Sequence, residues 1–237
     1  MELAAHGVSH AGRRSTNEDA LLVDVPHGLF VVADGMGGHN AGEVASELAV
    51  VTIGEAMAAG SEPVDARLGA AVQLANQRIY EAGHRSPEYS GMGTTVSAAC
   101  VRDGRLMFAN IGDSRIYRLH TGALTQLTRD DSWIAHALST GMALTRSEID
   151  AHPMRHVLTE VVGVRIDVPV AVQHLELDPG DVLLMCSDGL HGTLADDVLV
   201  SALESPASPE AIATLLVEQA IARGSSDNVS AIVVRCR

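Results

Sequence analysis

The fold of this chain is decided by residues 29–39, which read LFVVADGMGGH. Five apolar residues end abruptly in the carboxylate of Asp34, three glycines follow within the next four positions, and helical composition begins at Ala41. This pattern predicts a buried strand, a tight turn and then a helix. An acid that follows a buried strand either belongs to a solvated turn or is positioned at a functional site. The rest of the sequence is needed to distinguish these two possibilities.

The preceding segment predicts a hairpin that brings a second acid to Asp34. Apolar runs at 20–25 and 29–33 are separated by three residues, a common hairpin connection. With a loop of that length, Asp19 lies opposite Gly35 and next to Asp34. Neighbouring positions across a strand pair are roughly 5 Å apart, so two carboxylates there repel unless a cation or a proton lies between them.

The composition is that of a globular protein with an excess of acid. The 237 residues are 46% hydrophobic and 19% charged, which is enough apolar material for a sizeable core, and we assign residues 1–237 to a single domain. Sixteen basic and 30 acidic residues give a formal charge of −14, which argues against a nucleic-acid partner.

Other bulk features bear on location. No apolar run reaches the roughly 20 residues that a membrane span needs, and residues 1–6 lack a basic region followed by an apolar one, so neither membrane insertion nor secretion is expected. Three widely spaced cysteines suit a reducing compartment, and a cytoplasmic location is expected.

All sixteen basic residues are arginine. The absence of lysine excludes a P-loop, a kinase strand lysine and a Schiff-base lysine. Phosphate would therefore have to be bound by arginine, backbone amides or metal ions.

Periodicity along the rest of the chain predicts helices around a strand-rich centre. Helical runs cover 41–59 and 65–82, and a last helix begins after Ser208. Residues 133–155, with a capping-box pattern from Thr145 to Glu148, predict a peripheral helical insertion. The runs at 94–101, 105–111, 115–119 and 124–127 are separated by turn signals and predict an antiparallel meander.

Several acids lie at the boundaries of predicted strands. The strand-Asp-Gly pattern recurs at residues 182–189, and Asp227 leads into a final strand. The acids at these boundaries are Asp19, Asp34, Asp188 and Asp227, with Asp130 just after one. Carboxylates without cysteine or regularly spaced histidine suit Mg²⁺ or Mn²⁺. Two such ions about 4 Å apart can activate a shared water toward phosphorus, and an adjacent arginine can hold two phosphoryl oxygens.

The motifs in chain order are RSTNED at 14–19, VADGMGG at 32–38, GTT at 93–95, GDSR at 112–115, LTRD at 127–130, SDG at 187–189 and DN at 227–228. In order and spacing, over residues 12–234, the sequence resembles the metal-dependent type 2C (PPM) protein serine/threonine phosphatases in their stand-alone bacterial form. Each motif is weak alone, whereas the full series is specific.

The resemblance implies an α+β fold, a four-layer α-β-β-α sandwich of two antiparallel sheets flanked by helices, with residues 133–155 as a flap beside the site. It also implies two tightly bound Mn²⁺ or Mg²⁺ ions and a third, weaker one. The residues that it nominates for metal binding are Glu18, Asp19, Asp34, Gly35, Asp130, Asp188 and Asp227.

Individual roles also follow from the resemblance. Asp34 would bridge the two ions and Gly35 would offer its carbonyl oxygen, while Glu18 and Asp19 would act through metal-bound waters. Asp130 would help to bind the third ion. The residues nominated for catalysis are Arg14, Asp19, Asp34 and His39, with Arg14 and His39 also contacting the substrate.

The implied reaction is direct hydrolysis of phosphoserine and phosphothreonine on proteins by a hydroxide that bridges the two metal ions. The enzyme would reverse a Ser/Thr kinase and act as a monomer on phosphorylated protein substrates. The leaving oxygen needs a proton. Because Met36 stands where some relatives have a histidine, the acid is either His39 or metal-bound water, and His39 could equally be an ordinary loop residue.

The sequence also bears on two other functions. A dinucleotide fold is rejected because its third glycine would stand at position 40, which is Asn40. A pseudophosphatase-like binding or regulatory module of the same fold is the alternative, although every expected acid and Arg14 are present. Asp131 departs from the family pattern and places the third-metal site in doubt, and Asp113 is interpreted as structural.

Overall fold

Two antiparallel sheets form the centre of the structure. The computed structural model describes residues 1–37, 41–59 and 62–237. One sheet has the strand order β1-β11-β10-β7-β8, and the other has the order β2-β3-β5-β6-β9, with the short β4 paired to the end of β3. The first sheet contains β1 (Leu3–His10), β7 (Arg115–His120), β8 (Ala123–Gln126), β10 (Val182–Cys186) and β11 (Val229–Cys236). The second contains β2 (Asp19–Asp24), β3 (Leu29–Met36), β4 (Gly93–Thr94), β5 (Val96–Arg102), β6 (Arg105–Ile111) and β9 (Gln173–Glu176).

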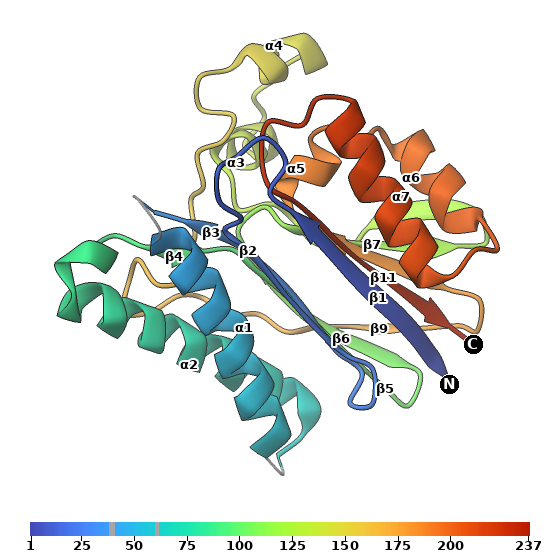
Figure 1. The fold of residues 1–237 in the computed structure, drawn as a ribbon, viewed down its shortest axis with the longest axis horizontal. Helices are drawn as coiled ribbons and strands as arrows, with labels where there is room; N and C mark the ends of the chain where they lie inside the picture. Colours follow the sequence, from blue (N-terminus) through green and yellow to red (C-terminus); the bar gives the residue numbers. More distant parts are fainter. Residues whose placement is uncertain (38–40, 60–61) are drawn as a thin grey trace.

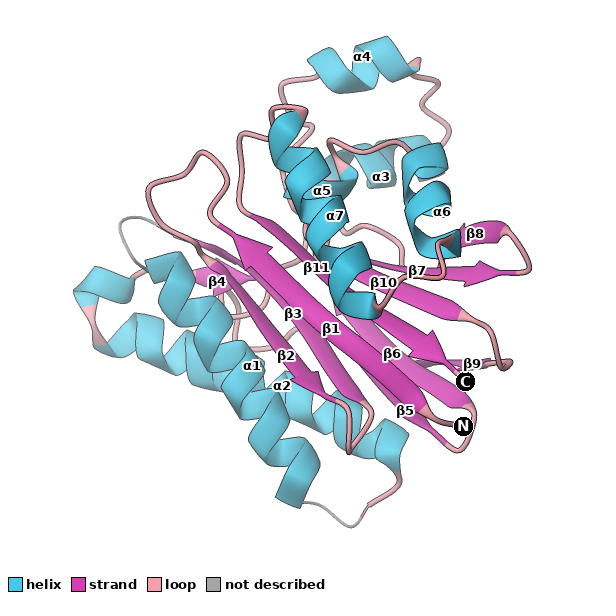
Figure 2. Cartoon of the chain, turned by 45° about the vertical axis from the view of Figure 1, so that its right-hand side comes forward, coloured by secondary structure: helices cyan, strands magenta, loops and turns pink. Residues whose placement is uncertain are grey.

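Helices cover the outer face of each sheet (Figures 1 and 2). The second sheet is covered by α1 (Ala41–Ala59) and α2 (Val64–Arg85), and the 3₁₀ helix η1 (Pro87–Tyr89) follows α2. The first sheet is covered by α5 (Asp188–His191), α6 (Asp196–Glu204) and α7 (Pro209–Ala222). Two further helices, α3 (Trp133–Ser139) and α4 (Arg146–Ala151), lie beyond the ends of the sheets. This arrangement confirms the predicted four-layer α-β-β-α sandwich.

Three apolar clusters fill the spaces between the layers. Along β3, Val31 packs with α1 and α2, whereas Phe30 and Val32 pack between the two sheets. Along β10, Leu184 faces α6 and α7 while Leu183 faces the other sheet. Because both faces of these strands are buried, they are continuous apolar runs rather than alternating ones, which is why they can be recognised in the sequence.

The register of the β2–β3 hairpin differs by one residue from the prediction. Asp19 lies opposite Asp34 itself, not opposite Gly35. The loop has four residues because the Gly28 amide donates to the Val25 carbonyl at 3.1 Å, and Gly28 adopts a positive φ of 65°. The sequence predicts neighbouring carboxylates at Asp19 and Asp34, and in the observed register these two residues are directly opposite each other.

The predicted meander of four strands is also wrong as a single sheet. β5 and β6 pair in the second sheet, whereas β7 and β8 belong to the first. The chain changes sheets at the turn that follows β6, where Gly112 has a φ of 99°. This crossing carries residues 112–114 to the end of the sandwich where the acids gather.

The helices agree closely with the prediction. α1 has the predicted bounds, the Thr145–Glu148 capping box forms at the start of α4, and the Ser208 hydroxyl caps α7. In the described part of the chain, no helix combines the length and apolar character that crossing a bilayer requires.

Candidate metal-binding active site

The predicted acids gather at the end of the sandwich opposite the chain termini. Leu3 pairs with Cys236 at one end of the β1–β11 pair and His10 pairs with Val229 at the other, so Asp227, two residues before Val229, lies at the end away from the termini. Figure 1 shows both termini at the same end of this strand pair. A cleft of about 860 Å³ opens at this end. The predicted site residues that line it are Arg14, Glu18, Asp34, Gly35, Asp130, Asp188 and Asp227.

Asp34 follows five buried residues of β3, and its backbone is held by hydrogen bonds. Its amide donates to the Thr95 hydroxyl at 3.0 Å, and its carbonyl accepts from the Thr94 hydroxyl at 2.9 Å and from the Thr95 amide at 2.8 Å. These bonds leave the carboxylate free to face the cleft. Burial raises the pKa of Asp34 well above its ordinary value, and the charges of Asp19 and Asp188 raise it further.

Gly35 allows a close approach of α1 to β3. A Cβ at this position would lie 2.1 Å from the Gly42 carbonyl oxygen and 2.6 Å from that of Glu18, so no side chain fits. The Gly35 amide donates to the Glu18 carbonyl at 3.0 Å, and the Ser46 hydroxyl of α1 donates to the same oxygen at 2.5 Å. The Glu18 backbone is therefore fixed beside Asp34.

Asp19 is only 8% exposed and does not line the cleft directly. Its Oδ2 atom accepts from the hydroxyls of Ser187, at 2.8 Å, and Ser230, at 2.6 Å. Burial raises the pKa of Asp19, and the two serines offset only part of that effect. Its other oxygen, Oδ1, is buried with no hydrogen-bond partner among the described residues.

Asp188 repeats this pattern from the first sheet. It follows β10 at the start of α5, and its Oδ1 atom is likewise buried without a partner in the described structure. Burial raises the pKa of Asp188, and the neighbouring charge of Asp227 adds to the effect.

The residues present fit divalent cations. Buried, unpartnered carboxylate oxygens are rare in folded proteins because leaving them unsatisfied is costly, and a cation satisfies them. The donors around the cleft are oxygens, which Mg²⁺ and Mn²⁺ prefer. The side chains that would hold such ions are those of Asp34, Asp188 and Asp227, with Asp19 behind them.

Arg14 lies at the rim of the cleft with its side chain 56% exposed. Its Nη2 atom donates to Asp227 Oδ2 at 2.8 Å. The hydrogen bond and the charge of Asp227 raise the pKa of Arg14. The guanidinium is thus a permanent positive charge beside the acidic cluster, and its remaining donors are available to an anion.

Asp130 lies in the cleft but is already paired. Arg115 Nε donates to Asp130 Oδ1 at 2.9 Å and Arg115 Nη2 donates to Oδ2 at 2.7 Å, a bidentate geometry. Gln126 adds a third hydrogen bond to Oδ1 at 3.0 Å. A third cation at Asp130 would have to share this carboxylate with Arg115.

The sequence predicts a structural turn role for Asp113, and the structure places this residue in the lining of the cleft. Burial raises its pKa to about 7, with further contributions from Asp188 and Asp130. His191 Nε2 donates to the Asp113 carbonyl at 2.9 Å and fixes the turn. The sequence cannot show whether an acid in a tight turn serves the turn or lines a site. Asp113 reaches the cleft only because the chain changes sheets at Gly112, and turn residues do not reveal that change.

The predicted flap contributes to the cleft wall, through Ile134 of α3, Ile149 of α4 and Arg155. His156 follows it, with Nδ1 4.0 Å from Asp188 Oδ2. His39, the predicted substrate contact, lies outside the described residues.

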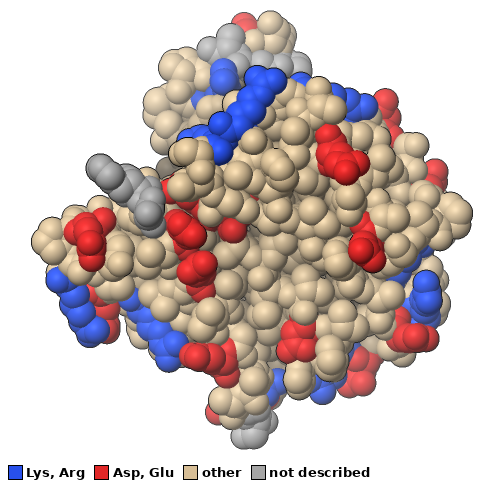
Figure 3. Space-filling view, viewed as in Figure 1, with Lys and Arg blue, Asp and Glu red and all other residues tan. Residues whose placement is uncertain are grey.

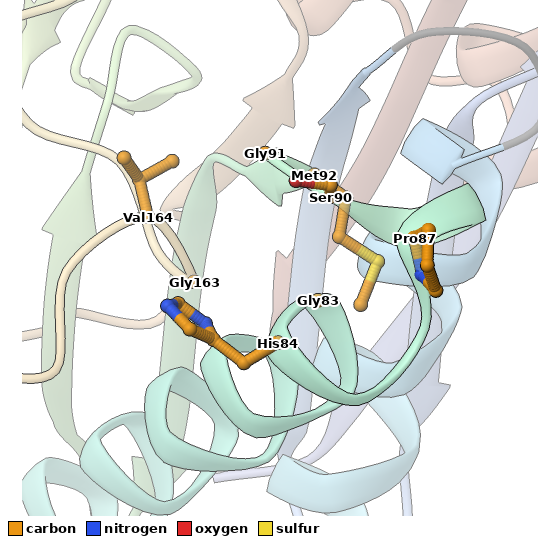
Figure 4. Close-up of a pocket in the computed structure, with 8 residues that line it drawn as sticks. All are labelled: Gly83, His84, Pro87, Ser90, Gly91, Met92, Gly163 and Val164. Atoms are coloured by element: carbon orange, nitrogen blue, oxygen red, sulfur yellow. The ribbon is translucent and has the colours of Figure 1, made fainter.

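Two other features lie away from this cleft. His120, Asp178 and Asp181 place their ligand atoms within 4.8 Å of one another, but Asp181 already accepts from Arg118 Nε at 2.8 Å and pairs with His120 Nδ1 at 2.7 Å. A hollow of about 510 Å³ near the end of α2 contains no carboxylate side chain (Figure 4). Its lining residues are Gly83, His84, Pro87, Ser90, Gly91, Met92, Gly163 and Val164.

A sandwich of two antiparallel sheets that presents buried carboxylates and an arginine to one cleft has the architecture of a metal-dependent phosphatase. Residues 6–220 match the family model of protein phosphatase 2C, and the chain belongs to that family.

Named relatives agree with this assignment. A putative protein phosphatase 2C-type of Streptococcus pyogenes is 35% identical over 229 residues, covering 94% of this chain and 92% of the relative. The serine/threonine protein phosphatase PstP of Mycobacterium tuberculosis is 37% identical over 224 residues, covering 93% of this chain but 42% of PstP. A solved structure of the PstP catalytic domain in complex with two manganese ions has a TM-score of 0.89 at 34% identity, covering 98% of this chain and 97% of that domain.

Proposed function

We propose that this protein hydrolyses phosphoserine and phosphothreonine on proteins in a reaction that requires two Mn²⁺ or Mg²⁺ ions. The observation that supports this most directly is a pair of buried, unpartnered carboxylate oxygens. One belongs to Asp188, which lines the cleft together with Arg14, and the other belongs to Asp19, which lies behind the lining residues. The serine/threonine phosphatase names of the relatives support the substrate class.

The metal-binding residues would be Asp34, the Gly35 carbonyl, Asp188 and Asp227, with Glu18 and Asp19 acting through water. When bound, the two cations would activate a water for direct attack on phosphorus and neutralise charge on the phosphoryl oxygens.

The chain's own groups would orient the substrate. Arg14 would hold two phosphoryl oxygens from the rim of the cleft, since a guanidinium binds phosphate bidentately. Asp19, fixed by Ser187 and Ser230, would accept hydrogen bonds from waters at the cleft floor. His39 or water would supply the proton to the leaving oxygen.

A third, weaker cation would lie at Asp130, sharing its carboxylate with Arg115. Its affinity would be low because the arginine already neutralises that carboxylate.

The broader setting follows from the same site. We infer a single catalytic domain over residues 1–237 with a flap at 133–155, acting as a monomer on phosphoproteins and reversing a cognate Ser/Thr kinase. Cys100, Cys186 and Cys236 are free and buried, which suits the proposed cytoplasmic location.

On the face drawn in Figure 3, acidic and basic side chains are interspersed rather than separated into large patches.

Purified protein should hydrolyse an aryl phosphate and phosphothreonine peptides with Mn²⁺ or Mg²⁺, and should lose that activity in excess chelator. Full activity in chelator would rule out the proposed chemistry. Phosphopeptide binding without turnover under every metal condition would favour the alternative, a binding module of the same fold.

A further inference from the structure

We propose that Asn228 is a positioning residue that fixes the loop carrying Arg14, residues 11–18, beside Asp227. This rests on the proposed function, because it concerns how the phosphate-binding arginine reaches its place. Asn228 is 4% exposed and lies between Asp227 and Val229, the first residue of β11.

The side chain of Asn228 uses its amide to close the base of this loop. Its Nδ2 donates to the Ala11 carbonyl at 3.0 Å and to the Thr16 carbonyl at 2.9 Å, one on each side of Arg14. Its Oδ1 accepts from the Glu18 amide at 2.8 Å. One buried side chain therefore ties the two stems of the loop to each other and to the residue that precedes β2.

The backbone around Asp227 and Asn228 is closely packed. Gly12 has a φ of 60°, and a Cβ there would lie 2.0 Å from the Asp227 carbonyl oxygen. On the other side of these two residues, a Cβ on Gly189 would lie 2.0 Å from the Asn228 carbonyl oxygen. Backbone from three segments thus meets at residues 227–228, with no room for a side chain at Gly12 or Gly189.

The tip of the loop depends on this base. Residues 13–15 are exposed. The Arg14 guanidinium bonds to Asp227, and the Arg14 amide donates to the Ala11 carbonyl at 3.0 Å, so the position of Arg14 depends on where Ala11 is held. The Asn17 side chain adds one further link between the two sides of the loop, because it donates to Ser9 Oγ at 2.7 Å and Ser9 lies in β1, just before Ala11. Without Asn228, the Ala11 and Thr16 carbonyls would lose the side chain that bridges them, and the Asn17–Ser9 bond alone would join the two stems. The guanidinium would then sample many positions instead of one.

The predicted consequence is a defect in phosphate binding more than in turnover. With Mn²⁺ bound, Asn228→Ala should raise KM for an aryl phosphate by roughly tenfold and weaken inhibition by inorganic phosphate to a similar extent, because small misplacements of a positioning group are costly. The value of kcat should fall much less, and Mn²⁺ affinity measured by calorimetry should stay close to that of the wild type.

A double-mutant cycle with Arg14→Ala separates positioning from general damage. If Asn228 acts through Arg14, adding Asn228→Ala to the Arg14→Ala enzyme should change KM by no more than about twofold. If the KM of the double variant rises by the product of the two single-variant fold-changes, Asn228 acts independently of Arg14, and the proposal is overturned.

Asn76 provides a matched control. It is also buried and makes the same three kinds of bond to a distant loop, from Nδ2 to the Arg165 and Ile166 carbonyls and from the Gly163 amide to Oδ1. Asn76→Ala should lower thermal stability about as much as Asn228→Ala while leaving KM and phosphate inhibition unchanged. Equal KM effects from both variants would contradict the proposal.

Two further outcomes are decisive. A wild-type KM in Asn228→Ala, or a loss of Mn²⁺ binding large enough to account for the KM change, would overturn the positioning role. If Asn228→Ala does not fold, Asn228→Ser, which keeps a small polar side chain but cannot bridge both carbonyls, is expected to show the same KM defect. A wild-type protein without turnover would instead reject the proposed function, and calorimetric binding of inorganic phosphate to wild type and variant would then still test Asn228.

Discussion

Asp19 and Asp34 face each other across the β2–β3 pair, and directly opposed residues project from the same face of a sheet. Burial raises the pKa of both carboxyls. Two serines stabilise one oxygen of Asp19, but Oδ1 of Asp19 and Oδ1 of Asp188 receive no hydrogen bond within the described structure. Carboxylates buried at such a cost must either bind a proton or face an opposite charge, and the second option is the physical reason to expect cations here.

The Asp130 carboxylate pairs with Arg115 and is also the proposed ligand of a third metal ion. A substitution of Asp130 can show which of these two roles stabilises the fold. The side chains of Arg115 and Asp130 are 25% and 14% exposed, so Asp130→Asn leaves a largely buried guanidinium without its anion. We expect a loss of about 1–3 kcal/mol in the free energy of unfolding, equal in Mn²⁺ and in chelator, measured by urea denaturation. A loss confined to Mn²⁺ would mean that Asp130 serves a metal ion before it serves Arg115.

An exposed pair of the same chemistry is the control for that measurement. Arg78 and Glu55 form an ion pair at 3.0 Å with side chains 44% and 62% exposed. Glu55→Gln should change the free energy of unfolding by less than about 0.5 kcal/mol, because solvent screens such pairs.

Among the elements, the β2–β3 hairpin depends on one glycine. Gly28 has a φ of 65°, and a Cβ there would lie 2.2 Å from the Val101 carbonyl oxygen of β5. Gly28→Ala should therefore destabilise the protein by more than the roughly 1 kcal/mol that a positive φ alone costs, as measured by denaturant unfolding. Gly180→Ala isolates that smaller cost, since Gly180 has a φ of 100° with no atom within 4 Å of its Cβ position. Equal losses in the two variants would show that the hairpin tolerates a displaced turn.

The junction of β7 with the β9–β10 turn makes the fold sensitive to acid. Burial acts to raise the pKa of Asp181, but hydrogen bonds from Arg118, the Asp178 amide and His120 outweigh it and hold the pKa below its ordinary value. A carboxyl with a depressed pKa in the folded state contributes stability that is present above its unfolded pKa and is lost as pH falls through the folded one. Below about pH 4, the wild type should thus lose stability faster than Asp181→Asn in unfolding measured against pH. Parallel curves for the two proteins would remove Asp181 from the acid response.

Local signals explain what could be predicted from the sequence at this scale. The α4 capping box, the Ser208 cap and the doubly buried strands are each encoded within a few residues, and the prediction found them. The hairpin register was missed because it depends on a backbone bond to Val25, and the change of sheet at Gly112 was missed because turn residues do not reveal which sheet the next strand joins. Within the site, the acids could be nominated from their positions at strand ends. The Arg115–Asp130 pair and the Asn228 contacts could not, since they join residues that are 15 and more than 200 positions apart.

In the whole molecule, the apolar clusters that stabilise the fold lie between the layers, and the candidate site lies at one end of the sandwich. Three apolar clusters hold the layers together between the termini and the cleft, and their largest fully buried members include Phe30 and Leu183. The carboxylates lie at strand ends contributed by both sheets. Holding the two sheets in place therefore also holds the acids close together, and the repulsion between them opposes folding unless it is neutralised.

Metal binding should consequently stabilise the entire fold. A cation that binds only the folded state adds about 2.7 kcal/mol at a concentration 100 times its Kd, so saturating Mn²⁺ should raise Tm by roughly 5 to 10 °C over chelator in a domain of this size. Asp34→Ala should abolish most of that response and should raise Tm in chelator, because it removes one of the mutually repelling charges. Asp181→Asn, which removes a carboxylate from the His120 cluster instead, should keep the full Mn²⁺ response. The same Tm for the wild type in Mn²⁺ and in chelator would show that the buried carboxylates are satisfied in some other way, and a response lost in Asp181→Asn would place the stabilising ion at the wrong end of the sandwich for catalysis.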